Sequence, residues 1–296
     1  MSLRLEMLQV ARLASTVLGA EAAALVETFI RSTQRENGGF ADRAGKSDLY
    51  YTSFALDALT ALQVALPEEQ LRSYLESFGT GDDLDFVHLC CLARLWSVLE
   101  KNVPAIDGIL DHLERKYRTH EDGGYNQTPG AGTGSSYGAL LAYGAYSDHG
   151  REIPELSRLV EESLPALATP EGAWVNDRNL PVPNVPSTAA AVSLYRNFRQ
   201  PIPAATGEWL LESRHAQGGF MAFPGAPMPD LLSTAVALHA LDGLQVSYRD
   251  AVEPCLDFID SLWTAAGGFH GNWNDEELDL EYTYYGLLAL GHLSLS

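Results

Sequence analysis

Strongly apolar segments alternate with amphipathic segments along the whole chain. The apolar segments carry Ala, Leu, Val and aromatic residues on almost every side, and the amphipathic segments place their charges mostly on one side. A helix that is apolar all round is a buried helix, whereas an amphipathic helix covers a core and faces water. The pattern therefore predicts pairs of helices, each with one outer amphipathic member and one inner buried member.

Polar residues mark the start of each inner helix. Asp, Ser and Thr are good N-caps, because their side-chain oxygens accept hydrogen bonds from the first free backbone N–H groups. Such openings occur at residues 48–52, 85–89, 134–137, 185–188, 230–234 and 279–283. The expected outer helices are residues 21–34, 67–78, 103–117, 154–168, 203–214 and 248–263. The pattern thus predicts six pairs of helices.

A glycine-rich signature separates the two helices of each pair. It occurs at Gly38-Gly39-Phe40, Gly123-Gly124-Tyr125, Gly172-Ala173-Trp174, Gly218-Gly219-Phe220 and Gly267-Gly268-Phe269. The aromatic residues of the last four copies lie 46 to 49 residues apart, and residues 78–86 hold a degenerate copy in the longer first gap. An open solenoid would expose its inner helices at both ends, so the repeats favour a closed ring. We expect an all-α fold, an (α/α)6 toroid of six helical hairpins around a central apolar cavity, with residues 1–296 forming a single domain.

The composition excludes several kinds of binding partner and indicates a cellular compartment. The formal net charge of −20 argues against binding to nucleic acid or to an anionic membrane, since both need basic surface. No apolar run approaches the length of a membrane span, and Arg4, Glu6 and Arg12 interrupt the N-terminal segment, unlike a signal peptide. Three cysteines, two of them adjacent, cannot form a disulfide framework. We therefore expect a cytoplasmic protein without a membrane span.

Two stretches of the chain resemble a known family. Residues 38–52 (GGFADRAGKSDLYYT) are similar to the repeats of protein prenyltransferase β subunits, and residues 279–287 (DLEYTYYGL) are similar to the last of those repeats. The repeat pattern as a whole resembles the prenyltransferase and squalene-cyclase superfamily. This resemblance implies an α/α toroid whose apolar funnel receives an isoprenoid. It leaves open a helical partner subunit, as the β subunits have, or a homodimer.

The resemblance also implies a zinc site, which the sequence does not keep. The family holds zinc with Asp-x-Cys in one repeat and Asp-x-x-His in the next, in order to activate a thiol. The matching positions here are Asp230, Leu232 and Tyr282, so one of the three ligands remains. Phe223 and Ala226 stand where basic, diphosphate-binding residues would be expected. We therefore predict no zinc at the family's position and assign no cofactor.

A second candidate site lies in the first repeat. Arg43 and Lys46 occupy the basic positions of its loop, where the family binds diphosphate. In a closed ring all inner helices begin at one mouth, and cationic donors there could hold an isoprenoid diphosphate. The alternative is that both residues are solvated loop charges.

Four residues next to that loop are the candidate catalytic residues. Asp48 and Tyr51 open the first inner helix, and Asp85 and His88 open the second with the family's Asp-x-x-His spacing. Asp48, Asp85 and His88, joined by Cys91, are also the alternative set of zinc ligands. The competing interpretation makes both aspartates ordinary N-caps and places Cys91 in the core.

Tyrosines on the inner helices are the candidate substrate-binding residues. Tyr50, Tyr137, Tyr282 and Tyr284 would line the funnel and offer apolar area and π faces to an isoprenoid. The alternative interpretation is that each of these tyrosines only packs between the two helix layers and binds no substrate.

Two classes of function follow from these residues. The segment Asp82-Asp83-Leu84-Asp85 holds the acids of the cyclase motif Asp-x-Asp-Asp in a different order, so it does not identify a cyclase. We expect a prenyltransferase-like protein that binds a polyprenyl diphosphate in the funnel and transfers or cyclises it. The alternative is a non-catalytic lipid-binding or scaffold toroid that has lost the chemistry, since a fold hosts many functions.

Overall fold

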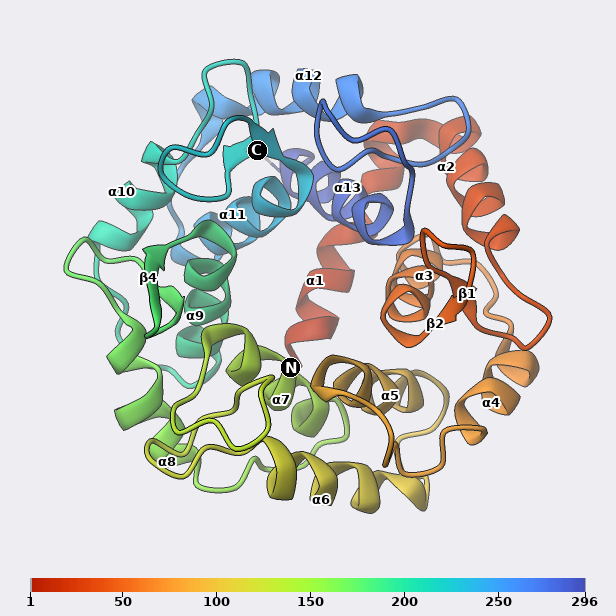
Figure 1. Cartoon of the computed structure of the whole chain (residues 1–296). Helices are drawn as coiled ribbons and strands as arrows, with labels where there is room; N and C mark the ends of the chain where they lie inside the picture. Colours follow the sequence, from red (N-terminus) through yellow and green to blue (C-terminus); the bar gives the residue numbers. More distant parts are fainter. Residues whose placement is uncertain (1, 296) are drawn as a thin grey trace.

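The computed structural model describes residues 2–295, and their helices form two concentric layers (Figure 1). The inner helices are α3 (Leu49–Ala61), α5 (Phe86–Leu99), α7 (Ser136–Asp148), α9 (Val185–Asn197), α11 (Leu231–Leu244) and α13 (Leu280–Leu293). The outer helices are α2 (Ala14–Ser32), α4 (Glu68–Glu76), α6 (Ala105–Tyr117), α8 (Leu156–Arg158), α10 (Ala205–Glu212) and α12 (Val252–Leu262). Successive inner helices pack against one another, and α13 contacts both α11 and α3. The ring is therefore closed, which confirms the predicted (α/α)6 toroid.

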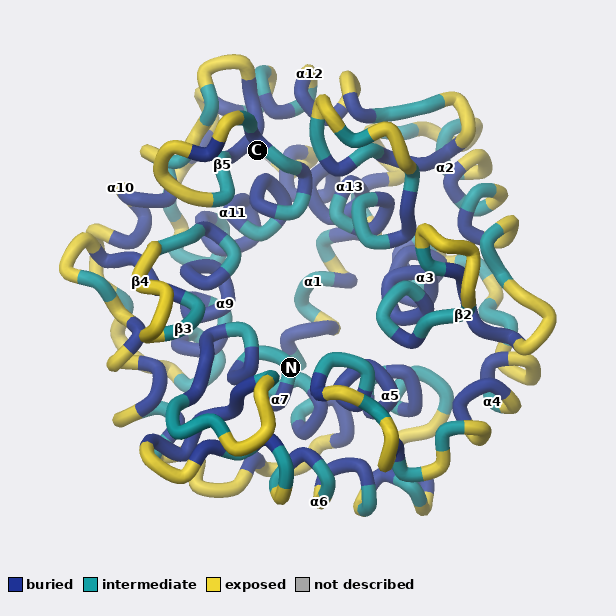
Figure 2. Tube along the Cα trace, viewed as in Figure 1, coloured by how far each residue is buried: buried dark blue, intermediate teal, exposed yellow. Residues whose placement is uncertain are grey.

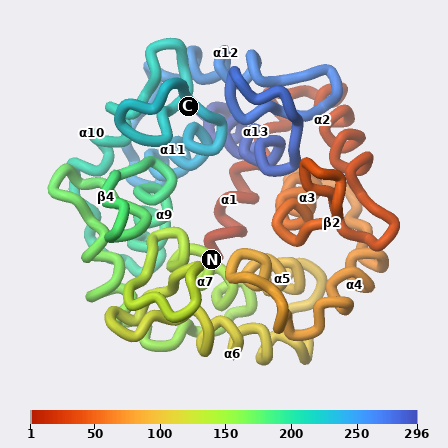
Figure 3. Tube along the Cα trace, viewed as in Figure 1, coloured from red at the N-terminus to blue at the C-terminus, as the bar shows by residue number. Residues whose placement is uncertain are grey.

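The two layers differ in burial as the sequence pattern predicts. Figure 3 follows the chain once around the ring, so that the first and last hairpins meet, and α2 packs against α13 there. In Figure 2 the inner helices are largely buried, whereas the outer helices alternate buried and exposed residues. Among residues 2–295 no single helix is long and apolar enough to cross a membrane. One pair of helices, residues 3–11 together with α2, has the length and composition of a membrane span, but the two helices meet at an angle of 71°.

The glycine-rich turns position the starts of the inner helices. Within the described chain three of these turns hold an antiparallel pair of strands: β1 (Phe40–Ala41) with β2 (Ser47–Asp48), β3 (Val175–Asp177) with β4 (Leu180–Pro183), and β5 (Phe220–Met221) with β6 (Pro229–Asp230). The backbone N–H of Phe220 donates to Thr234 Oγ1 at 2.9 Å, while Asp230 caps α11. The N–H of Phe40 likewise donates to Thr52 Oγ1 at 2.9 Å. The repeated Asp and Thr of the sequence thus fasten the buried aromatic residue to the helix start.

In the five clear copies of the signature, the first glycine lets the hairpin approach the next outer helix closely. Gly218 has a φ of +96°, and a Cβ atom there would lie 1.9 Å from the carbonyl oxygen of Pro254 in α12. Gly267 has a φ of +92°, and a Cβ atom there would lie 2.2 Å from the carbonyl oxygen of Leu25 in α2. Only glycine combines a positive φ with such a close approach. Gly267 therefore makes one of the contacts through which the last repeat meets the first.

Two outer segments differ from the predicted helices. The expected helix at residues 154–168 is α8 followed by a π-helical turn (Leu159–Ser163) and a 3-10 turn (Pro165–Leu167). Glu155 begins this segment with a φ of +47°, and Pro165 lacks the N–H group that a regular helix would use. The first outer helix begins at Ala14, earlier than the predicted residue 21, and has a kink at Gly19.

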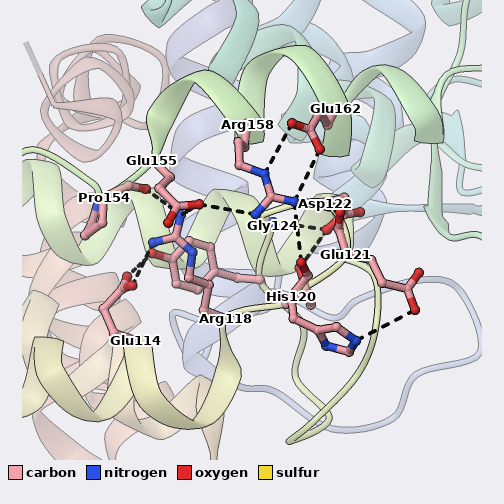
Figure 4. Close-up of polar contacts among 12 residues, drawn as sticks. Glu114, Arg118, His120, Glu121, Asp122, Gly124, Pro154, Glu155, Arg158 and Glu162 are labelled. Carbon is pink, nitrogen blue, oxygen red and sulfur yellow. Dashed lines mark hydrogen bonds and ion pairs between the residues drawn. The ribbon is translucent and has the colours of Figure 1, made fainter.

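Ion pairs hold the loop that lies against this irregular segment (Figure 4). Arg158 of α8 donates to the carbonyl oxygen of Glu121 at 2.6 Å and pairs with Glu162 at 3.2 Å. Arg118, which follows α6, pairs with Glu114 of α6 at 2.8 Å and donates to the carbonyl oxygen of Pro154, just before α8, at 3.0 Å. These contacts tie α6, its following loop and α8 together where the outer layer lacks a regular helix.

An N-terminal helix, α1 (Leu3–Ala11), crosses the middle of the ring and has no counterpart among the predicted helices (Figure 1). It packs against α3, α7 and α13. Glu6 pairs with Arg196 at 2.7 Å, near the C-terminal end of α9. The carbonyl oxygen of Val10 approaches Gly291 closely, near the C-terminal end of α13. This helix therefore closes the end of the ring opposite to the starts of the inner helices.

Candidate functional site

The inner helices and α1 surround a central cavity of about 380 Å³. Its walls are mostly apolar and rich in aromatic residues, and they include Leu3, Met7, Phe54, Leu140, Leu141, Ala190, Leu232, Val236 and Tyr285. Tyr50, Tyr137 and Tyr284, three of the predicted substrate-binding residues, line it as well. The predicted apolar cavity is thus confirmed, and the role of these tyrosines in binding stays a prediction.

A second, polar cavity of about 490 Å³ lies where the inner helices begin, and we call it the mouth pocket. Its lining residues are Arg43, Tyr51, Asn272, Asn274, Asp275, Asp279, Glu281 and Tyr282. Of the predicted residues, Tyr282 lies here rather than in the central cavity, and Tyr51 lies beside it. Burial raises the pKa of Tyr51 to about 12, so its phenol is neutral at physiological pH.

Arg43 lies at the mouth pocket, but carboxylates already surround it. Its Nη2 pairs with Asp275 Oδ2 at 2.7 Å, and its Nε pairs with Asp279 Oδ2 at 2.7 Å. The bonds to Asp275, ahead of those to Asp279, raise the pKa of Arg43 above its usual value. Lys46 is exposed and lines neither cavity, and its backbone N–H donates to Asp42 at 2.8 Å. The predicted pair of basic residues therefore does not converge on the mouth pocket as two free cations.

Three of the predicted catalytic residues lie together. His88 Nε2 lies 2.9 Å from Asp48 Oδ2, and His88 Nδ1 lies 2.8 Å from Asp85 Oδ1. The bond to Asp48, with a further contribution from Asp85, raises the pKa of His88 to about 9 although burial opposes the shift. Both aspartates also accept N-cap bonds, Asp48 from Tyr50 and Tyr51 and Asp85 from His88. Each aspartate is thus both a cap and a partner of the imidazolium, and the group lines neither cavity.

We expect His88 to stay protonated throughout the physiological pH range. Replacing Asp48 with Asn removes the larger of the two favourable contacts, so the pKa of His88 should fall by at least about one unit. Titration of the imidazole resonances by NMR measures this. Asp42→Asn is the matched control, because Asp42 bonds to the Lys46 backbone and not to His88. A His88 pKa that is the same in the wild type and Asp48→Asn would contradict the geometry.

Within residues 2–295 no other set of side chains replaces the family's zinc ligands. Leu232 lines the central cavity and Tyr282 lines the mouth pocket, so the positions of the missing Cys and His hold side chains that cannot bind zinc. Among residues 2–295 no group of three or more His, Cys, Asp or Glu side chains could hold a metal ion. Burial raises the pKa of Cys91 to about 12, which keeps it a thiol rather than a thiolate ligand. The described residues therefore do not fit the zinc that the family uses.

Glu281 is a site residue that sequence reasoning missed. Its Oε1 accepts a hydrogen bond from the Tyr50 hydroxyl at 2.7 Å. Glu281 lines the mouth pocket and Tyr50 lines the central cavity, so this pair joins the two spaces. Burial raises the pKa of Glu281 to about 7, with a further contribution from Asp279, although the bond from Tyr50 opposes the shift. At neutral pH a substantial fraction of this carboxyl group carries a proton.

The repeats contain a signal that could have found Glu281. It stands two positions after its N-cap, Asp279. In four other repeats the residue two positions after the N-cap lines the central cavity: Tyr50, Tyr137, Pro186 and Leu232. A carboxyl side chain at that position is therefore expected next to the cavity, and among the six inner helices that the structure describes only α13 has one there.

The sequence matches the model of one known family. A family model of the prenyltransferase alpha-alpha toroid domain matches residues 20–110 and 188–295, so the chain belongs to this family. No curated protein matches the chain in sequence.

Solved structures with the same fold include enzymes of two kinds. A variant of the type II terpene cyclase MstE from Scytonema, in complex with the substrate geranylgeranyl dihydroxybenzoate, is 13% identical with a TM-score of 0.64, over 97% of this chain and 98% of that one. The Candida albicans protein geranylgeranyltransferase-I, complexed with GGPP, is 14% identical with a TM-score of 0.63, over 92% and 90%. Identities this low show the fold alone.

Proposed function

We propose that the chain binds an isoprenoid in the central cavity and cyclises it, with Glu281 as the acid that starts the reaction. The observation that carries this proposal is the pair of Tyr50 and Glu281, a half-buried carboxyl group hydrogen-bonded to a residue that lines an aromatic cavity. The similar structures include a cyclase with a geranylgeranyl substrate and a transferase with GGPP. The size and apolar lining of the cavity are those of a typical small-molecule site.

The first step is a proton transfer to an alkene. Because Oε1 of Glu281 accepts the bond from Tyr50, Oε2 is the oxygen that carries the proton. The alkene's π electrons form the new C–H bond, the adjacent carbon becomes a carbocation, and Glu281 is left as a carboxylate. A second alkene of the same chain attacks the cation and closes a ring, and loss of a proton from carbon to water ends the sequence. Water at the mouth pocket then reprotonates Glu281.

The aromatic residues would stabilise the cationic intermediates. Tyr50 packs edge-on against Phe54 with ring centres 4.9 Å apart, and Phe54 lies 5.8 Å from Tyr284 and 5.5 Å from Tyr285. Their π faces attract a cation, and the effect is larger where water is excluded. A cluster of rings along the cavity therefore serves a carbocation better than it serves a thiolate acceptor.

A second candidate is binding of a polyprenyl diphosphate with its head near Arg43 and Lys46, followed by transfer. Arg43 favours it, because this cation lines the mouth pocket. A diphosphate would have to displace Asp275 and Asp279 from Arg43. If Arg43→Ala combined with Lys46→Ala leaves the affinity for a polyprenyl diphosphate unchanged, the diphosphate does not bind there.

Incubation with polyprenyl compounds of increasing length tests the main proposal. Products separated by gas chromatography should have the mass of the substrate but fewer alkene signals, because cyclisation rearranges bonds without adding atoms. Binding of isoprenoids without any product would instead support the non-catalytic alternative.

Removal of metal ions is expected to leave this turnover unchanged. The described residues offer no group of three ligands for zinc, and the proposed acid acts without one. Turnover of a neutral polyprenyl substrate after exhaustive dialysis against a chelator measures this. Loss of activity that added zinc restores would show that the acid is not sufficient.

A further inference from the structure

A cluster of charged side chains borders the central cavity toward its closed end. Arg4 on α1 pairs through Nε with Asp57 Oδ1 on α3 at 2.6 Å, and both side chains are buried. Arg94 on α5 lies next to this pair, with Nη1 3.8 Å from Asp57 Oδ2. Its Nε lies 3.8 Å from Oδ2 of Asp148, the last residue of α7. An apolar funnel alone does not need these four charges.

Arg94 is the member of this cluster that faces the cavity. It lines the cavity together with Leu3 and Met7 of α1, and its side chain keeps 26% of its surface accessible, against 3% for Asp57 and Asp148. Both carboxylate contacts of Arg94, at 3.8 Å, are longer than a hydrogen bond. Among residues 2–295 the guanidinium group of Arg94 thus makes no hydrogen bond, and it lines a space that is mostly apolar.

Such a group is costly unless an acceptor reaches it. Burying a charged donor without a partner costs more than the average hydrogen bond returns. One carboxylate oxygen nearby, Oδ2 of Asp148, also lacks a hydrogen-bond partner, and it is too buried for a ligand to reach. The missing acceptor for Arg94 must therefore come from whatever fills the cavity.

We propose that Arg94 binds the oxygenated end of the cavity's ligand, a hydroxyl, carbonyl or carboxylate group on an isoprenoid chain. Arg4 and Asp57 neutralise each other in direct contact, and Asp148 balances Arg94 from a distance, so the cluster as a whole carries no net charge. A ligand with one hydroxyl, carbonyl or carboxylate group changes the charge of this cluster by one unit at most. A diphosphate would bring several negative charges next to Asp57 and Asp148.

The contact also sets the direction of the ligand. With its oxygen at Arg94, the chain extends along the aromatic wall, and its far alkene lies toward Tyr50 and Glu281. This orientation rests on the proposed function, since it presents an alkene to the acid. The contact with Arg94 itself does not depend on turnover.

Binding measurements with three probes of equal chain length test the contact. The probes are a C20 polyprenyl alcohol, the corresponding polyprenoic acid and the hydrocarbon without oxygen, and calorimetry gives each affinity. Arg94→Met with Asp148→Asn removes one charge of each sign, which keeps the cluster neutral and guards against misfolding. We expect this double variant to bind the alcohol and the acid about ten- to a hundredfold more weakly and the hydrocarbon as the wild type does. Arg94→Lys, which keeps a cation, should restore part of the loss.

The outcomes separate this contact from the proposed function. If the double variant binds all three probes as the wild type does, or loses affinity for all three equally, the contact is wrong while isoprenoid binding stands. If the wild type binds none of the three, both the proposed function and this contact are wrong. Tighter wild-type binding of the hydrocarbon than of the alcohol and the acid would also overturn the contact.

Discussion

Replacing Glu281 with Gln is expected to lower turnover of the isoprenoid about a hundredfold or more. Gln has the same shape and its amide oxygen can still accept the bond from Tyr50, but it has no acidic proton to donate. Positioned acid catalysis typically contributes a factor of about 100 to 10,000. Affinity for the isoprenoid should stay within about threefold, because the apolar contacts remain. Single-turnover kinetics combined with equilibrium binding separate the two quantities.

The pH dependence of the wild type follows from the same residue. The pKa of Glu281 is raised to about 7, so the protonated fraction, and with it the rate, should fall as pH rises through 7. Glu276→Gln is the control for Glu281→Gln, because Glu276 is exposed in the preceding loop and does not line the mouth pocket. Turnover of Glu281→Gln at the wild-type rate would assign the acid to another group.

The pH dependence of the free energy of unfolding reports the raised pKa of Glu281 without any substrate. A carboxyl group whose pKa is higher in the folded state favours folding fully below the unfolded pKa of 4.5, and this stability is lost as pH rises through about 7. The shift corresponds to about 3 kcal/mol of the free energy of unfolding. Urea unfolding at pH 5 and pH 8 should therefore show a larger loss in the wild type than in Glu281→Gln.

Replacing Gly218 with Ala is expected to lower the free energy of unfolding by at least about 3 kcal/mol. Its φ of +96° strains any residue with a Cβ atom, and that atom would lie 1.9 Å from the carbonyl oxygen of Pro254. The oxygen belongs to the backbone of α12, so the clash is relieved only by moving a helix away from the hairpin. Chemical denaturation of the variant and the wild type measures the loss.

The same loop contains a matched control for this effect. Gly225 also has a positive φ, of +86°, but a Cβ atom there would meet nothing within 4 Å. Gly225→Ala therefore carries the backbone strain alone and should cost about 1 to 2 kcal/mol. Equal losses in the two variants would mean that contact with α12 does not depend on the first glycine of the repeat.

The architecture was predictable because its determinants are local and repeated. The N-cap of each inner helix and its glycine-rich turn lie within one repeat, and in four repeats a threonine follows the N-cap by four residues, as Phe220, Asp230 and Thr234 illustrate. The contact between Asp85 and His88 spans three residues and is readable in the same way. The fourth outer segment is helical within its predicted bounds but irregular, because Glu155 and Pro165 interrupt a segment whose hydrophobic pattern alone predicts one continuous helix.

The candidate site was only partly predictable, because closure of the ring creates it. Arg43 meets Asp275, and Tyr50 meets Glu281, across the junction of the first and last hairpins, with more than 230 residues between partners. No local pattern encodes such pairs, since they depend on the summed angles of all the hairpins. The mixture of apolar and charged residues in α1 matches neither the inner nor the outer helices, so the sequence predicted no position for it. Its place across the ring follows from its packing against α3, α7 and α13.

The sequence by itself determined the class of fold, the apolar character of the central cavity and the absence of the family's zinc ligands. Each of these depends on residue types at regular spacings. The tertiary structure alone decided that Arg43 is neutralised, that Glu281 is half-buried beside Tyr50 and that Arg94 faces the cavity. These properties arise from burial and from charges brought close by distant segments, and both quantities exist only once the ring has closed.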